Sequence, residues 1–347
     1  MAKRVRFGDI ASFKYGKMPN KKRITENGKY PIYSGYRYVG FYDEYNIEAN
    51  QLIIVARGVG GTGDVKLTKE RCYLTNLSIA ADIDTNVVVP EYLYYYFMSQ
   101  NLRYLDSGSA QSQITISDLE RVIILVPSLS DQQIVCSYLK LLDNKIENNK
   151  EINKNLEQQA QAIYNRIFIE QHQESWNTGQ LSDLIAVKYG KDHKKLADGC
   201  YPVYGSGGIM RYVEKPLYTG ESVLIPRKGT LNNVIYVNEA FWSVDTMFYT
   251  EMLHPNVAKF VYHFVKNKNL ASLNAGSAVP SMTTNILNAM QLYIPDEKTL
   301  EKFENIVSPI YNAMQKNTKE SKLLANARDT LLPKLMSGEL DVSAIDL

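Results

Sequence analysis

Apolar residues recur at alternating steps of three and four in two stretches of the chain, which is the spacing of a coiled-coil seam. The seam of the first stretch, residues 130–170, consists of Val135, Leu139, Leu142, Ile146, Asn149, Asn153, Leu156, Ala160, Ile163 and Ile167. The seam of the second stretch, residues 296–338, consists of Phe303, Val307, Ile310, Met314, Asn317, Ser321, Leu324, Arg328, Leu331 and Leu335. Each stretch is predicted to form one long helix, and the matching seams predict that the two helices pack together.

Polar residues interrupt both seams at their centres, Asn149 and Asn153 in the first and Asn317 and Ser321 in the second. Such a polar layer fixes the register of a helix pair. In an antiparallel pair Asn149 faces Ser321 and Asn153 faces Asn317, which gives each a hydrogen-bond partner. A parallel pair also matches them, so the pattern leaves the direction open. At about 1.5 Å per residue the seam is on the order of 50 Å long, which suits the pair to act as a ruler.

Outside these helices the pattern alternates with a period of two, which favours strands over residues 32–41, 65–74 and 234–237, while residues 91–100 favour a short helix. Ser130 with Gln133 reads as a capping box at the start of the first long helix. Asp296 is expected to cap the second. Near its end, Pro333 is expected to kink or end the helix, with Gly338 as a terminal cap.

The chain repeats itself with a period of about 170 residues, and this duplication governs how every local motif is interpreted. Residues 7–17 (FGDIASFKYGK) return as 181–191 (LSDLIAVKYGK), residues 30–33 (YPIY) as 201–204 (YPVY), residues 52–57 (LIIVAR) as 223–227 (VLIPR), and residues 105–110 (LDSGSA) as 273–278 (LNAGSA). In the third pair each apolar run ends in arginine, so Arg57 and Arg227 are predicted to correspond.

The predicted fold class is α+β, with two repeated α/β modules separated by two long helices that pack as an antiparallel coiled coil. The expected boundaries are a first module at residues 1–129, a central helix at 130–170, a second module at 171–295, a C-terminal helix at 296–338 and a tail at 339–347. An antiparallel pair would relate the modules by a pseudo-two-fold axis and hold them at opposite ends of the helices.

Composition describes a globular chain of 347 residues, with 45% hydrophobic and 22% charged residues. Gly8 follows the basic N-terminal residues where a signal peptide needs an apolar region, and no stretch is long enough to span a membrane, so we expect a cytoplasmic protein. The three cysteines share no metal-site spacing, and each is expected to be buried. The net charge of only +2 means that any basic surface must be local.

No catalytic constellation is present, and we predict that the chain is not an enzyme. Residues 57–64 (RGVGGTGD) resemble a phosphate-cradling loop but lack the lysine and hydroxyl residue of a P-loop, so a hairpin loop and a DNA contact both stay open. The four histidines have no metal-ligand spacing. We therefore expect no metal site and no cofactor in this chain.

Polar and basic residues on the repeated loops suit contact with DNA. Arginine can bind guanine at two points, which contributes about 1–3 kcal/mol of discrimination per base. Lys17 and Lys191 occupy matching positions that suit a phosphate contact. A turn or capping role is the alternative for each candidate. The candidate DNA-contacting residues are Lys17, Tyr33, Ser34, Arg57, Gly58, Gly60, Asn76, Gln111, Gln113, Lys191, Tyr204, Ser206, Arg227, Lys228, Asn232, Asn233 and Ser281.

The doubled order of these motifs resembles the DNA-specificity subunit of type I restriction-modification systems. The resemblance covers residues 5–340. It rests on a Gly-Lys segment, a Tyr-Pro-x-Tyr strand, a Gly-Ser-Ala loop, a Val-Pro or Ile-Pro step and a long helix in each half, and on residues 331–339 (LLPKLMSGE), which look like the C-terminal helix of that family.

The resemblance implies a non-catalytic subunit in which each module reads one half of a gapped double-stranded DNA sequence and the coiled coil sets the gap. It also implies two adenine-N6 methyltransferase subunits as partners, with restriction subunits where these are present. S-adenosylmethionine, ATP and Mg²⁺ then belong to the partners. The rival interpretation is a coiled-coil adaptor that binds protein partners without DNA, and an enzyme with an unrecognised site is a weaker third.

Overall fold

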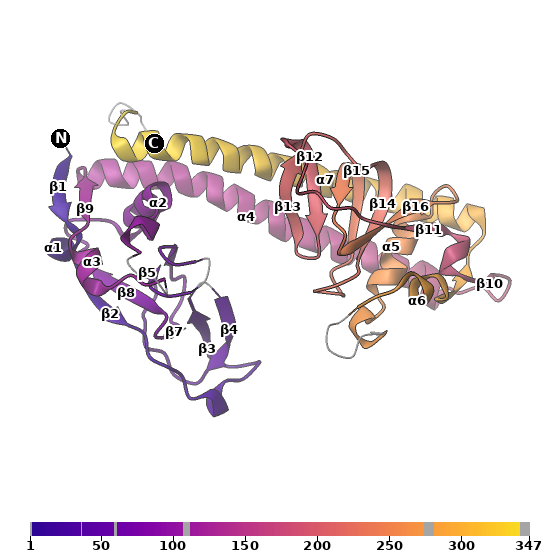
Figure 1. Ribbon diagram of the computed structural model, residues 1–347, viewed down its shortest axis with the longest axis horizontal. Helices are drawn as coiled ribbons and strands as arrows, with labels where there is room; N and C mark the ends of the chain where they lie inside the picture. Colours follow the sequence, from indigo (N-terminus) through magenta and orange to yellow (C-terminus); the bar gives the residue numbers. More distant parts are fainter. Residues whose placement is uncertain (1, 36, 59–60, 107–111, 274–280, 341–347) are drawn as a thin grey trace. The chain divides into compact units, whose positions relative to one another are not determined.

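The computed structural model describes residues 2–35, 37–58, 61–106, 112–273 and 281–340. The chain divides into two compact units (Figure 1). Unit 1 combines Met1–Lys150 with Thr318–Leu347, and unit 2 is Glu151–Asn317. Each unit contains one module of strands and short helices together with part of each long helix, α4 (Leu129–Asn165) and α7 (Glu297–Ser337). The predicted class of repeated α/β modules and long helices is confirmed.

Three sheets form the module of unit 1: a pair β1-β9, a four-stranded sheet β2-β8-β5-β6 and a three-stranded sheet β4-β3-β7. The strands are β1 (Lys3–Arg6), β2 (Ala11–Tyr15), β3 (Tyr30–Ser34), β4 (Arg37–Tyr42), β5 (Leu52–Val55), β6 (Val65–Leu67), β7 (Tyr73–Leu74), β8 (Ser78–Ile83) and β9 (Ile123–Val126). The short helices are α1 (Phe7–Ile10), η1 (Lys21–Arg23), α2 (Pro90–Gln100), η2 (Leu102–Leu105) and α3 (Ile116–Glu120).

Unit 2 repeats this plan with longer strands, in a pair β10-β17 and a six-stranded sheet β11-β16-β14-β15-β12-β13. The strands are β10 (Asn177–Gln180), β11 (Ile185–Tyr189), β12 (Asp198–Gly205), β13 (Gly208–Val213), β14 (Tyr218–Pro226), β15 (Ile235–Ser243), β16 (Met247–Met252) and β17 (Gln291–Ile294). The helical segments are η3 (Arg166–Glu170), η4 (Leu181–Asp183), α5 (Ala258–Lys266), η5 (Leu270–Leu273) and α6 (Thr284–Asn288).

Within each unit the segments of α4 and α7 run antiparallel. In unit 1 the Nδ2 of Asn149 donates to Ser321 Oγ at 3.3 Å, and Arg328 pairs with Asp143 at 2.6 Å. In unit 2 the Nδ2 of Asn317 donates to Asn153 Oδ1 at 2.9 Å. These are the facing pairs expected for antiparallel helices. That they select the register stays a prediction.

The long helices also complete the cores of the modules. In unit 1, Val135 and Leu139 of α4 and Leu332 and Met336 of α7 lie in one buried cluster with α2 residues such as Tyr92. In unit 2, Tyr164 of α4 and Phe303, Val307 and Tyr311 of α7 pack with α5 around Phe260. Burial of each such side chain contributes about 1.5–3 kcal/mol, so the modules and helices depend on one another for stability.

The long helices differ from the sequence expectation at two points, the N-terminal cap of α4 and the passage of α7 through Pro333. α4 is capped by Ser128, whose Oγ accepts from the Asp131 amide at 3.2 Å, and not by Ser130. α7 begins as predicted, with Asp296 accepting from the Thr299 amide at 2.9 Å. It then continues through Pro333.

The passage of α7 through Pro333 has a packing explanation. A proline inside a helix costs about 3 kcal/mol. Leu332 and Met336, on either side of Pro333, are only 4% and 2% exposed, and their burial offsets that cost. The buried face of α7 is also shifted by one position from the predicted seam. The predicted seam residue Leu331 is 38% exposed, whereas its neighbour Leu332 is buried.

Two predicted strands are also interrupted. The run 32–41 is the hairpin of β3 and β4, which turns at Gly35 with a positive φ of 59°. The run 65–74 is divided into β6 and β7. The segment between these strands is bonded to another loop through Thr68, whose Oγ1 donates to the Glu48 carbonyl. Cys200 is exposed, in contrast to the prediction, because it lies where the register of β12 shifts beside β13.

Candidate nucleic-acid interface

A tight turn after β2 begins the candidate interface of unit 1. The amide of Lys17 donates to the carbonyl of Leu74 at 2.9 Å, and the amide of Gly16 donates to that of Ser78 at 3.1 Å. A Cβ on Gly16 would overlap the Thr75 carbonyl oxygen, so only glycine allows this approach. The lysine side chain is left exposed.

The other candidates of unit 1 are held around the same β7–β8 turn. Thr75 Oγ1 donates to Ser34 Oγ at 3.3 Å, and the Arg57 amide donates to the Leu77 carbonyl at 3.0 Å. Gln113 forms a β-bridge with Arg57. We call Lys17, Ser34, Arg57, Asn76 and Gln113 loop cluster 1. The structure therefore brings together residues that lie almost a hundred positions apart in the chain.

Unit 2 builds the same arrangement around the β15–β16 turn. The amide of Lys191 donates to the Ser243 carbonyl at 2.8 Å, and the amide of Gly190 to that of Met247 at 3.0 Å. The amides of Arg227 and Lys228 both donate to the Thr246 carbonyl, at 2.8 and 3.2 Å. Lys228 also forms a β-bridge with Ser281. We call Lys191, Ser206, Arg227, Lys228 and Ser281 loop cluster 2.

Matching backbone bonds correct one predicted correspondence. In unit 1 the amides of Ala56 and Arg57 both donate to the Leu77 carbonyl. In unit 2 the amides of Arg227 and Lys228 both donate to the Thr246 carbonyl. The bridges agree, because Arg57 pairs with Gln113 and Lys228 with Ser281. The structural counterpart of Arg57 is thus Lys228, and Arg227 corresponds to Ala56.

Arg227 is also held differently from Arg57. Its Nη1 donates to the Asp245 carbonyl at 3.3 Å, and its guanidinium lies 5.4 Å from the ring centroid of Tyr189. Such a cation–π contact restricts the motion of the guanidinium. Nε of Arg57 is buried and has no hydrogen-bond partner among the residues that the structure describes.

The serines of the two clusters are staggered. The amide of Thr75 donates to the Tyr33 carbonyl, and the amide of Val244 donates to the Tyr204 carbonyl in the same way. Tyr33 therefore corresponds to Tyr204. The residue after each tyrosine is Ser34 in unit 1 and Gly205 in unit 2, so Ser206 lies one position beyond the counterpart of Ser34. The carbonyl of Ser206 accepts from Asn233 Nδ2 at 2.7 Å. Asn233 therefore fixes the backbone of this loop.

Several candidates have their polar groups engaged inside the protein. Tyr204 is 8% exposed and its hydroxyl donates to Glu239 at 2.7 Å; burial and that carboxylate raise its pKa. Asn232 donates to Asn269 Oδ1 at 3.2 Å and accepts from the Ala271 amide at 3.0 Å. The half-buried Tyr33 ring lies under Lys66, and burial raises its pKa. These three support the loops in this structure.

The backbone on the two sides of the glycine-rich run after β5 is paired as in a hairpin, because the Val55 amide donates to the Asp64 carbonyl and the Val55 carbonyl accepts from the Gly63 amide, both at 2.9 Å. Gly58 has a φ of 145°, which favours glycine. Gly60 and Gln111, also candidates, lie outside the described residues, as do most residues of the Gly-Ser-Ala loops. Among the residues that the structure describes, no cluster of histidine, cysteine or carboxylate side chains could hold a metal ion.

Two tyrosines at the edge of the clusters were missed by the sequence prediction. Tyr15 is 37% exposed and Tyr189 is 52% exposed, each directly before the Gly-Lys turn. Both belong to the identical four-residue sequence KYGK, and that identity was the available signal. Exposed aromatic rings beside lysines can stack on bases or sugars.

A family model described as the type I restriction modification DNA specificity domain matches residues 2–158 and again residues 173–324. The chain belongs to this family. Each match covers one repeat, so the specificity domain occurs twice, and the predicted resemblance is confirmed.

Relatives of this specificity-domain chain carry the same description. Over 319 residues it is 24% identical to the type I restriction enzyme MjaIX specificity subunit of Methanocaldococcus jannaschii, which covers 78% of this chain and 74% of that protein. It is 25% identical to a putative type I specificity subunit of Mycoplasma pneumoniae, with 94% of each covered.

A solved structure has the same fold. The crystal structure of a type I restriction-modification S subunit from M. genitalium matches with a TM-score of 0.62 and 21% identity, covering 97% of this chain and 96% of that one. In the described part of this specificity-domain chain, every helix is too short or too polar to cross a membrane.

Proposed function

We propose that this chain is the recognition subunit of a type I restriction-modification complex and reads a bipartite, gapped double-stranded DNA sequence. Loop cluster 1 reads one half-site and loop cluster 2 reads the other. The antiparallel helices set the spacer between the half-sites. The chain itself is non-catalytic, and it directs adenine-N6 methylation and restriction by its partner subunits.

The observation that carries this proposal is the repeated backbone support of the two clusters. In both units a Gly-Lys turn and a cation after an apolar strand are bonded to equivalent carbonyls of one turn. A rigid support that holds different polar side chains at equivalent positions suits two modules that perform the same task on different base sequences.

The remaining components of the proposal concern partners. Two methyltransferase subunits would bind S-adenosylmethionine, and restriction subunits, where present, would use ATP and Mg²⁺. Unit 1 offers apolar contact points on its helices, because Leu141 is 61% exposed and Leu323 is 69% exposed.

The test is single-molecule sequencing of genomic DNA from cells with and without the gene, scoring N6-methyladenine. We expect a gapped two-part motif that disappears with the gene and returns when the wild-type gene is restored. Purified complex with its methyltransferase should methylate a duplex that carries this motif. A protein that forms its complex but shows no salt-dependent binding to duplex DNA would instead favour the adaptor interpretation.

A further inference from the structure

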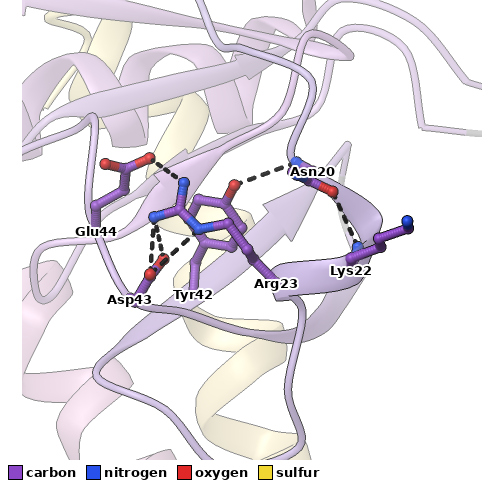
Figure 2. Close-up of polar contacts among 6 residues, drawn as sticks. All are labelled: Asn20, Lys22, Arg23, Tyr42, Asp43 and Glu44. Carbon is purple, nitrogen blue, oxygen red and sulfur yellow. Dashed lines mark hydrogen bonds and ion pairs between the residues drawn. The ribbon is translucent and has the colours of Figure 1, made fainter.

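A short turn that carries lysines follows the Gly-Lys segment in unit 1 (Figure 2). Asn20 Oδ1 accepts from the Lys22 amide at 3.1 Å, and the Asn20 carbonyl accepts from the Arg23 amide at 2.9 Å. The Ile24 amide donates to the Lys21 carbonyl at 3.4 Å. An Asn side chain that bonds two residues ahead in this way pre-forms the turn without help from a partner.

The turn is fixed to strand β4 by its arginine. Arg23 bonds to Asp43 at 2.7 Å and to Glu44 at 3.2 Å, and its guanidinium lies 4.7 Å over the Tyr42 ring (Figure 2). The Tyr42 hydroxyl also accepts from the Asn20 amide at 3.2 Å. The charge of Arg23 is therefore used within the protein, and its contacts hold the neighbouring lysines in place.

Unit 2 contains a turn with two of these bonds, which begins directly after Lys191, whereas Asn20 lies three residues after Lys17. Asp192 Oδ1 accepts from the Lys194 amide at 3.1 Å, and the Leu196 amide donates to the His193 carbonyl at 3.1 Å. By these bonds Asp192 corresponds to Asn20 and Lys194 to Lys22. We call residues 20–24 and 192–196 the lysine turns.

The lysines of both turns are exposed, and none of Lys21, Lys22, Lys194 and Lys195 forms an ion pair with a described residue. In a chain with a net charge of only +2, residues 17–23 carry three lysines besides Arg23, whose charge Asp43 and Glu44 offset, and residues 191–195 carry three lysines and one carboxylate, Asp192. These turns are therefore local concentrations of positive charge.

The position of the first turn suits a backbone contact beside the bases that loop cluster 1 would face. The turn is anchored to Tyr42, and Tyr42 pairs with Tyr30 at the start of β3. Ser34 of loop cluster 1 lies at the other end of β3. Four residues of strand span about 13 Å. The major groove is about 12 Å wide. A lysine at this separation can meet the phosphates at the edge of the groove.

We propose that the two lysine turns bind DNA backbone phosphates, one turn for each half-site, and contribute affinity without sequence preference. This inference rests on the proposed function. The turns then supply attraction, whereas the loop clusters discriminate between bases, and the two contributions can be separated experimentally.

The test measures binding of the purified full-length chain to a mixed-sequence duplex as a function of salt concentration. The variants are Lys22→Gln, Lys194→Gln and the combination of both. We expect the slope of log K against log salt to become shallower by about 0.9 for each single change and by about 1.8 for the combination. Lys22→Arg should keep the wild-type slope. The methylated motif in cells should be unchanged.

Two exposed lysines outside the turns, Lys69 and Lys298, provide the matched controls as Gln variants, since they remove the same charge. An unchanged slope in the combined variant, or an equal change in the controls, would overturn the inference. A change in the bases of the methylated motif would also overturn it. If the wild-type chain itself binds duplex without salt dependence, the proposed function fails first.

Discussion

The difference between Arg57 and Lys228 is the most informative single-residue feature. Both amides occupy the same bonding position in their units, yet the side chains differ in chemistry. Arginine offers a planar fork that matches guanine, whereas lysine is a flexible point charge. Equivalent positions that carry different side chains are what two unlike half-sites require.

We predict that Arg57→Ala alters recognition of the first half-site alone, by about 1–3 kcal/mol, because it would remove the two-point contact with guanine that we propose for this side chain. Lys228→Ala should weaken the second half-site alone. Arg227→Ala serves as the neighbouring comparison, with a smaller effect because Asp245 and Tyr189 already hold its guanidinium. The measurement is methylation of duplexes with single-base changes in each half-site.

Loss of discrimination at both half-sites from one of these changes would contradict the modular proposal. A larger effect from Arg227→Ala than from Lys228→Ala would restore the correspondence suggested by the sequence. All three variants keep the backbone bonds of their loop clusters, so their folding can be verified by an unchanged thermal midpoint.

The residue-scale comparison also marks the limit of sequence reasoning. The Gly-Lys turns were recognisable, because identical residues surround Gly16 and Gly190. Arg57 and Arg227 were mismatched because both follow apolar runs, and the one-residue offset becomes visible only from the carbonyls that their amides share. The inward hydroxyl of Tyr204 was likewise not evident, since the half-buried Tyr33 and the buried Tyr204 occupy the same position of one motif.

At the scale of elements, a short helix in each module is bonded to the long helices. In unit 2 the buried His263 of α5 contacts Gln161 of α4 and Tyr311 of α7, both at 2.9 Å. Because the glutamine Oε1 can only accept, His263 Nδ1 donates to it. In the neutral imidazole, which the lowered pKa of His263 favours, Nε2 accepts from the tyrosine hydroxyl. In unit 1, Tyr95 of α2 bonds to Asp143 of α4 at 2.8 Å.

This network predicts that unit 2 loses stability in mild acid. Burial lowers the pKa of His263 to about 4, and the charge of Lys266 adds to this effect. The carboxylate of Glu157 acts in the opposite direction but does not outweigh them. At pH values between that pKa and the value of about 6.5 in the unfolded chain, the unfolded chain binds more protons than the folded chain. The free energy of unfolding therefore decreases as the pH is lowered through this range. We expect a loss of about 2 kcal/mol between pH 7 and pH 5, measured by chemical denaturation.

His263→Gln is the matched variant, because it retains a polar side chain that does not titrate. It should be less stable at pH 7 and should show a smaller change between pH 7 and pH 5. An equal change in wild type and variant would assign the acid sensitivity to other groups. The carboxylates of Glu157 and Glu221 have lowered pKa values and therefore titrate below this window.

Elements were predictable where periodicity was long and less so where tertiary packing intervened. The two helices follow from seams that persist over many turns. The strand run 65–74 was predicted as one strand although its alternation is broken by Lys69, Glu70 and Arg71. In the structure Thr68, directly before them, bonds to residues of a different loop. The passage of α7 through Pro333 depends on the module core, which no local pattern records.

For the whole molecule, the proposed ruler has a direct test. Deleting residues 147–153 from α4 together with 317–323 from α7 removes facing segments, including Asn149 with Ser321 and Asn153 with Asn317. Seven residues of helix correspond to about 10 Å. That is about three base pairs of duplex at 3.4 Å each. We expect methylation of a motif with unchanged half-sites and a spacer shorter by about three base pairs.

The control for this deletion removes residues 147–153 alone. It leaves the α7 segment without its facing partners, and we expect loss of methylation or loss of a defined spacer. Methylation at the original spacing by the paired deletion would contradict the role of the helices as a ruler.

The division of the chain into units also has a consequence for biosynthesis. Unit 2 is one uninterrupted segment, Glu151–Asn317, whereas unit 1 is assembled from both ends of the sequence. Leu332 and Met336 complete the core around Val135 and Leu139. Because a ribosome releases residues in order, the module that emerges first must wait, incomplete, until the last helix has been made. The second module to be synthesised is therefore the first that can fold to completion.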